Sequence, residues 1–175
     1  MMLKLLLISV PFLFFLGSML HFVYGVSDKN KIVALFVPVN ESIFEHSKLL
    51  LVPLVLFWGI AYFFIKNDID VNKYFTAMLM SIIFSILVMV SFYYTYKEII
   101  GNSYLWIDIF DLLLSLFLGQ IIANHFYEYG IGVPAFLSLG IVLSIFVFYT
   151  YLTFKPFKTP FFYDEKRKVY GINKK

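Results

Sequence analysis

The stretch YFTAMLMSIIFSILVMVSFYYTY, from Tyr74 to Tyr96, decides the fold. It contains no charged residue and is dominated by Met, Ile, Leu, Val and aromatic side chains. An α-helix needs about 20 predominantly apolar residues to cross the hydrocarbon core of a bilayer. We therefore predict that this stretch forms a transmembrane helix.

Four further stretches on either side of it meet the same criterion. The predicted spans are approximately residues 3–25, 48–65, 74–96, 105–125 and 134–154. The apolar run 32–39 is too short to cross and is predicted to be an interfacial or re-entrant segment. The expected fold class is an all-α, polytopic integral membrane helix bundle of about five helices. Residues 1–154 would form the bundle and residues 155–175 a basic cytoplasmic tail.

The composition of the whole chain agrees with membrane insertion. Of its 175 residues, 61% are hydrophobic and 14% are charged, whereas soluble domains average about 45–50% and about 25%. A soluble fold of this length has too much surface to hide so many apolar side chains. The absence of cysteine excludes thiol catalysis, disulfides and thiolate metal sites. The net charge of +3 gives no indication of nucleic-acid binding, so the lipid bilayer is the expected partner.

The distribution of Lys and Arg predicts an orientation. With five spans the termini lie on opposite sides, and eleven basic residues fall on the side of the tail against three on the other. The positive-inside rule places the richer side in the cytoplasm, which predicts a multi-pass protein of the cell membrane with its N-terminus out and its C-terminus in. A crossing by residues 32–39 would reverse this parity. We expect the basic tail to contact anionic lipid headgroups, and the part around Asp164 and Tyr170 to fold back under this face.

This topology gathers ionisable residues near the predicted cytoplasmic face. Such groups are costly at membrane depth and usually face a bundle interior or a cavity. The candidate polar site consists of His21, Asn40, Glu41, Glu45, His46, Asp108 and Asp111, with Glu41, Glu45, His46 and Asp111 at its centre. On the fourth span, a polar stripe that should point into the bundle lies within roughly 80° of helical arc and comprises Asp108, Asp111, Ser115 and Gly119.

These residues also have purely structural explanations. Ser42 and Glu45 fit a capping box, in which the Glu45 side chain reaches back to the amide of Ser42. Glu41, four residues before Glu45, is expected on the same helix face, and the helix dipole favours acidic groups in a first turn. Asp108 is shallow enough to reach headgroup water. Asp111 lies one turn deeper and needs a partner, for which the candidates are Lys48, His21 and His46.

Three functional interpretations remain open. The first is a membrane-embedded metal-dependent hydrolase, in which a glutamate acts as general base and a divalent metal takes ligands from His21, Glu41, Glu45, His46 and Asp111. The chain has no HExxH, GxSxG or Walker motif, and no catalytic residue is assigned. The second is a small transporter or lipid-binding protein that acts as an oligomer. The third is a non-catalytic membrane subunit that acts through a protein partner.

Several segments together carry a resemblance to a known family. They are LHFVY (20–24), IVALFVPVNESIFEHSKL (32–49), PFKTPFFYD (156–164) and YGI (170–172). They resemble an uncharacterised prokaryotic family of small multi-pass membrane proteins with a PVNES-x-x-EH-x-K segment. The resemblance implies a bacterial or archaeal cytoplasmic-membrane protein whose signature includes Asn40, Glu41, Ser42, Glu45, His46 and Lys48. It implies no activity, because the family has none assigned.

Overall fold

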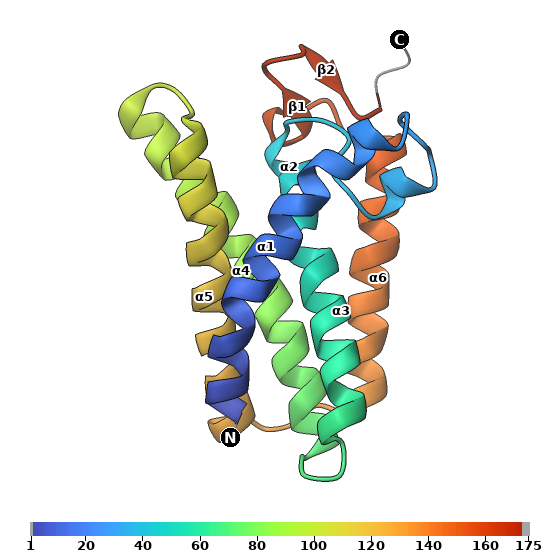
Figure 1. Cartoon of the computed structure of the whole chain (residues 1–175), viewed down its shortest axis with the longest axis vertical. Helices are drawn as coiled ribbons and strands as arrows, with labels where there is room; N and C mark the ends of the chain where they lie inside the picture. The colour runs from blue at the N-terminus through green and yellow to red at the C-terminus, as the bar shows by residue number, and fades with distance from the viewer. Residues whose placement is uncertain (1, 173–175) are drawn as a thin grey trace.

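Five long helices dominate the computed structural model, which describes residues 2–172 (Figure 1). They are α1 (Met2–Val26), the nearly continuous pair α2 (Ile43–His46) and α3 (Lys48–Ile65), α4 (Val71–Ile100), α5 (Leu105–Tyr129) and α6 (Ala135–Phe154). Each is long and apolar enough to cross a membrane. The predicted all-α bundle with five membrane-length helices is therefore confirmed.

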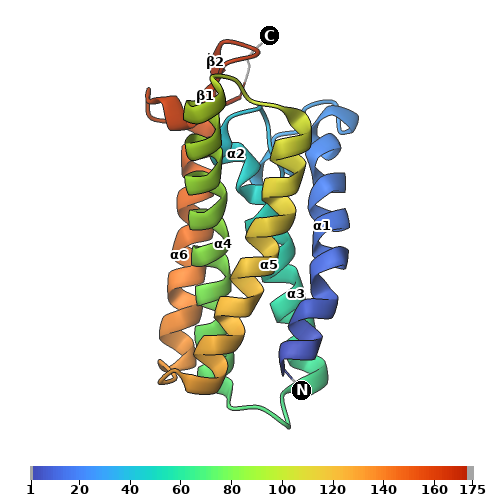
Figure 2. The ribbon, with the colours of Figure 1, turned by 90° about the vertical axis from the view of Figure 1, so that its left-hand side faces the viewer.

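The helices run alternately up and down, so that the N-terminus lies at one end of the bundle and the C-terminal segment at the other (Figures 1 and 2). Helix α1 packs against α3 and α5, and α4 packs against α3, α5 and α6. The C-terminal segment contains a short β-hairpin, so we call the end of the bundle that carries it the hairpin end. The last turns of α1, α4 and α6 and the first turns of α3 and α5 meet there.

Helix α4 is longer than the apolar run within it, because it begins at a polar cap and ends at a glycine, both of which lie outside that run. The side chain of Asp70 caps its first turn by accepting a hydrogen bond from the Lys73 amide at 3.0 Å. Gly101 ends the helix in a left-handed conformation, with φ of +83°, which glycine adopts without steric cost. The helix therefore runs from the Asp70 cap to Gly101 and extends beyond the predicted span 74–96 on both sides.

The segment between α1 and α2 stays at the hairpin end and does not cross the bundle (Figure 1). It contains one short 3-10 helix, η1 (Val33–Leu35). The ring of Phe36 lies 5.6 Å from that of Phe146 on α6, and Val37 and Val39 pack with Tyr24 of α1. Because this segment returns to the end from which it came, the two termini remain at opposite ends.

Small and polar side chains close the interface between α4 and α5. A Cβ atom placed on Gly119 would overlap Ser85 Oγ and lie 3.1 Å from the carbonyl oxygen of Ser81. Next to this contact, Ser81 Oγ donates to Gln120 Oε1 at 3.1 Å, and Gln120 Nε2 donates to Ser9 Oγ of α1 at 3.0 Å. Small residues allow such close backbone approach between membrane helices, and interhelical hydrogen bonds add to it.

The C-terminal segment forms a small cap on the hairpin end. A 3-10 helix, η2 (Pro160–Phe162), leads into an antiparallel hairpin of β1 (Tyr163–Asp164) and β2 (Val169–Tyr170). Phe162 is buried against Phe44 of α2, with ring centroids 4.6 Å apart. The expected folding back of this segment under the hairpin end is confirmed by a hydrogen bond from the Glu41 amide to Asp164 Oδ2 at 2.9 Å.

Candidate functional site

The loop before α2 is shaped by its own side chains. The Glu45 amide donates to Ser42 Oγ at 3.3 Å, and the Ser42 amide donates to Asn40 Oδ1 at 2.9 Å. The predicted capping box is therefore half formed, since Asn40 takes the place that Glu45 was expected to fill. Helix α2 begins only at Ile43. The expectation that Glu41 and Glu45 share a helix face is wrong, because Glu41 lies in the loop.

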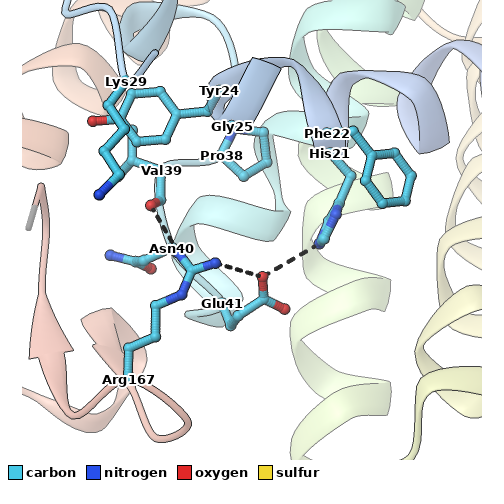
Figure 3. A pocket seen from close by; sticks show the side chains of 10 residues that line it. All are labelled: His21, Phe22, Tyr24, Gly25, Lys29, Pro38, Val39, Asn40, Glu41 and Arg167. Carbon is cyan, nitrogen blue, oxygen red and sulfur yellow. Dashed lines mark hydrogen bonds and ion pairs between the residues drawn. The ribbon is translucent and has the colours of Figure 1, made fainter. Parts of the chain in front are cut away.

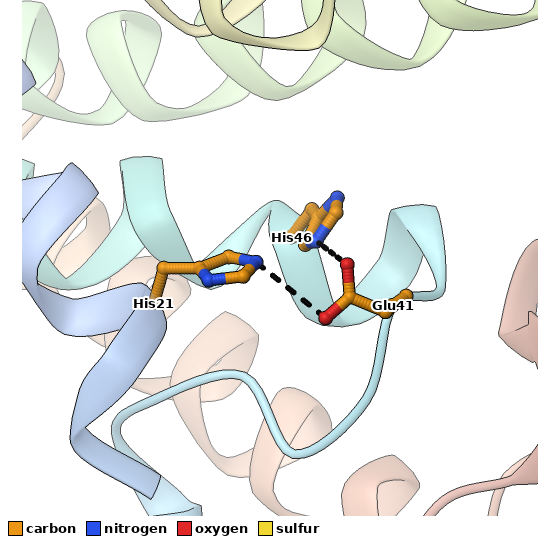
Figure 4. A group of neighbouring side chains, drawn as sticks. All are labelled: His21, Glu41 and His46. Atoms are coloured by element: carbon orange, nitrogen blue, oxygen red, sulfur yellow. Dashed lines mark ion pairs between the residues drawn. The ribbon is translucent and has the colours of Figure 1, made fainter. Parts of the chain in front are cut away.

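Two histidines converge on the Glu41 carboxylate (Figure 4). His21 comes from the last turns of α1 and His46 from the end of α2. The distance from His21 Nε2 to Glu41 Oε1 is 3.6 Å, and that from His46 Nε2 to Glu41 Oε2 is also 3.6 Å. The two imidazole rings lie 5.3 Å apart. Residues separated by a loop and a helix boundary are thereby brought into one cluster.

Two cations of the hairpin also approach Glu41. Lys166 Nζ lies 3.6 Å from its Oε2 atom and Arg167 Nη2 lies 3.8 Å from its Oε1 atom. Arg167 also donates to the Val39 carbonyl oxygen at 3.3 Å (Figure 3). Glu41 is half-buried, and contacts with His21, and then with His46, hold its pKa well below its usual range. The carboxylate is therefore ionised at neutral pH, as a metal ligand must be.

The geometry of the three residues suits a metal ion. One ligand atom from each of His21, Glu41 and His46 can be chosen so that all lie within 4.8 Å of one another. In a tetrahedral site with bonds of about 2.0–2.1 Å, neighbouring ligand atoms are about 3.3 Å apart. The two histidine nitrogens lie 3.6 Å from different oxygens of Glu41, and a set with one carboxylate oxygen is looser, within 4.8 Å. His46 Nε2 is buried and makes no hydrogen bond among the described residues, although it faces Glu41 Oε2 at 3.6 Å. A buried polar atom without a hydrogen bond calls for an explanation, and a metal ion at the cluster would supply one.

The cluster lies between two cavities that share His21, Phe22 and Glu41. The first, of about 560 Å³, is lined by polar and apolar groups in nearly equal measure and extends toward Lys29 and Arg167 (Figure 3). The second, of about 440 Å³, is lined mainly by apolar side chains of α1, α3, α4 and α5 and also by His46, Asp108 and Lys166. A group held by the cluster would therefore be accessible from both sides.

A family model matches residues 1–172, from α1 through the hairpin. The chain belongs to DUF6512, a family of unknown function. Comparisons with curated proteins and with solved structures find no match. The function of this DUF6512 protein is therefore inferred from the geometry of the site.

Glu45 of this DUF6512 chain is engaged elsewhere, in a buried ion pair with Lys48 at 2.8 Å. Its Oε1 atom accepts from Thr153 Oγ1 at 3.0 Å and its Oε2 atom from the Val39 amide at 3.1 Å. Lys48 Nζ also donates to the carbonyl oxygens of Ala34 and Val37. Both oxygens of the buried Glu45 carboxylate are thus engaged in joining α3, α6 and the loop, which indicates a structural role.

The two aspartates of α5 occupy different places. Asp108 lines the apolar cavity together with the cluster and accepts a hydrogen bond from the Tyr96 hydroxyl. Asp111 is buried one turn further along, where it accepts from Ser115 Oγ at 3.0 Å. Among the described residues that line the two cavities, neither Asp111 nor Glu45 occurs. Asp111, Ser115 and Gly119 are all buried, as the polar stripe on this helix predicted.

Asn40, the remaining predicted residue, is buried and positions the loop. Its Nδ2 atom donates to the Gly171 carbonyl oxygen at 3.0 Å. Lys166 and Arg167 could not be predicted from the sequence as neighbours of Glu41. Their run of basic residues indicates only a lipid contact, and two strands this short carry too little pattern to predict where the turn between them lies.

Proposed function

We propose that this DUF6512 protein binds a divalent transition metal such as Zn²⁺ through His21, Glu41 and His46, and acts as a membrane-embedded metal-dependent hydrolase. The proposal rests on the convergence of three ligand atoms, from α1, the loop and the end of α2, to within 4.8 Å of one another. Imidazole and carboxylate are suitable zinc ligands, and two His with one Glu is a ligand set of catalytic zinc sites. The fourth position of such a site is taken by water or substrate.

The proposed reaction is hydrolysis of an ester. A metal held by His21, Glu41 and His46 would supply an activated water for attack on the carbon or phosphorus of the ester. Asp108, which lines the same cavity, would take the proton from that water and return it to the alcohol as the bond between the alcohol and the ester carbon or phosphorus breaks. Tyr96, which donates to Asp108, would hold the carboxylate in place.

We place this site at the cytoplasmic face of the cell membrane. The hairpin end carries Lys155, Lys158, Lys166, Arg167 and Lys168, and basic residues are enriched on the cytoplasmic side of membrane proteins. A substrate would reach the cluster from the headgroup region, where water needed for hydrolysis is also present.

The test is metal analysis of the detergent-purified full chain after equilibration with Zn²⁺ and removal of excess ion. We expect about one zinc per chain in the wild type. Glu41→Gln and His46→Ala should each lower zinc affinity by at least about tenfold, since removing even groups that orient ligands costs 10–100-fold. Isothermal titration of the metal-stripped protein gives the affinities.

His125→Ala is the matched control, because His125 lies on α5 and contacts Phe126 and Tyr129 instead of the cluster. It should retain the full zinc content. Thermal unfolding of each variant in the metal-free state separates loss of ligand from loss of fold. Absence of stoichiometric zinc in the wild type, or an equal loss in His125→Ala, would contradict the proposal.

A further inference from the structure

The apolar cavity beside the cluster has the two-part character of a lipid site. Its volume of about 440 Å³ falls within the range of about 300–1,000 Å³ typical of ligand pockets. One part is polar and contains His21, Glu41, His46, Asp108 and Lys166. The remainder is formed by apolar side chains, among them Phe14, Leu49, Met89, Ile109 and Leu112. An occupant must therefore be polar at one end and hydrocarbon at the other.

The apolar walls are open to the side of the bundle. Phe22 and Leu105, which flank the cavity on α1 and α5, are 68% and 71% exposed, and Ile109 is 47% exposed. The upper parts of α4 and α5 lean away from α1 (Figure 1). Since these helices are long and apolar enough to cross a membrane, acyl chains of the surrounding bilayer would face this opening and could enter it without crossing water.

The charges at the polar end select the headgroup. Lys166 is 66% exposed on its side chain, so its ammonium can turn from Glu41 toward the cavity. Asp108 already accepts a hydrogen bond from Tyr96. With a divalent metal on the cluster, the metal and Lys166 outweigh the two carboxylates, and the polar end becomes positive. Without the metal, the two carboxylates outweigh Lys166 and the polar end is not positive. An anionic headgroup would therefore bind only to the metal-loaded protein.

We propose that this cavity binds an acyl lipid with a phosphate-bearing anionic headgroup, the phosphate lying between the metal and Lys166 and the acyl chain between α1 and α5. This inference rests on the proposed metal site and names the class of substrate for it. Metal and ammonium are both strong partners for phosphate oxygens. The chemistry of the site thus favours a lipid phosphate over a neutral lipid and over a soluble phosphate.

The test measures binding of short-chain phosphatidic acid to the full chain in detergent, with and without Zn²⁺, by native mass spectrometry and titration. Diacylglycerol with the same chains lacks the phosphate, and glycerol 3-phosphate lacks the chains. We expect phosphatidic acid to bind the zinc-loaded protein at least about tenfold more tightly than either, and than it binds the metal-free protein.

Two variants separate the lipid site from the metal site. Lys166→Gln should weaken phosphatidic acid binding by about tenfold while zinc content is kept. Ile109→Trp should fill the cavity and block the acyl chain, whereas Ile121→Trp, on the same helix and outside the lining of this cavity, should not. Both tryptophan variants should retain zinc.

The outcomes are distinguishable. Zinc binding without a preference for phosphatidic acid would overturn this inference and leave the metal site standing. Equal binding of phosphatidic acid with and without zinc, or equal binding of glycerol 3-phosphate, would also overturn it. A wild type that takes up no zinc and binds no phosphatidic acid would overturn both proposals.

Discussion

At the scale of single residues, two neighbouring glutamates have opposite environments. Glu45 is fully buried, and its carboxylate is matched by Lys48, Thr153 and the Val39 amide. Glu41 is half-buried and faces His21 and the largely exposed side chain of Lys166, which is free to move away. A fully satisfied buried charge holds a structure together, whereas a carboxylate with exchangeable partners can take a ligand.

The buried pair predicts a large loss of stability when one partner is removed. Glu45→Gln leaves the Lys48 ammonium buried without its counter-charge, which should cost about 3–5 kcal/mol. The matched control is Lys97→Gln, which breaks the exposed pair of Lys97 with Glu165 and should cost under about 1 kcal/mol. Unfolding in detergent by heat or denaturant measures both. An equal effect of the two substitutions would refute the structural role of Glu45.

At the scale of elements, the apolar length of each helix could be predicted from the sequence, because hydrophobicity over about 20 residues is a local property. The role of Glu41 could not be predicted from the sequence. Its spacing from Glu45 suggested a shared helix, but Asn40 caps the Ser42 amide and the helix begins after Glu41. Its contact with Lys166 depends on where the hairpin packs, which no local pattern encodes.

The packing of α4 on α5 predicts different outcomes for two helical glycines. Gly119→Ala would place a Cβ atom onto Ser85 Oγ, and such overpacking should cost about 1–3 kcal/mol. At Gly140 on α6 the added Cβ meets nothing within 4 Å, so Gly140→Ala should be neutral or stabilise by up to about 1 kcal/mol. Thermal unfolding of the two variants in the same detergent gives the comparison. Similar stabilities would show that α4 and α5 do not approach as closely as described.

At the scale of the whole molecule, the two ends of the bundle differ in charge and in structure. The hairpin end carries the cluster, the cavities and most of the basic residues, while the other end has only short connections between helices (Figure 2). This asymmetry is predictable from the sequence, because the spans assign each Lys and Arg to one side of the bundle. The meeting of His21, Glu41 and His46 depends on how α1 packs against the loop. The positions of the spans alone do not predict that packing.

The absence of cysteine in the chain allows a direct test of orientation. Asp68→Cys and Lys158→Cys place single thiols at exposed positions on opposite ends of the bundle. In intact cells, a membrane-impermeant maleimide should label the thiol at position 68, and it should label the one at position 158 only after permeabilisation. The cysteine-free wild type is the blank. The reverse pattern would place the cluster outside the cell and contradict the positive-inside assignment.

The hydrogen bond between the Glu41 amide and Asp164 has a consequence for biogenesis. The ribosome makes the two histidines and Glu41 early, whereas Asp164 and Lys166 follow α4, α5 and α6 in the chain. Until they are made, the loop before α2 lacks the cap that later covers it. The site can therefore be completed only after all five long helices have been synthesised, and a nascent chain halted after α6 would carry an unfinished cluster.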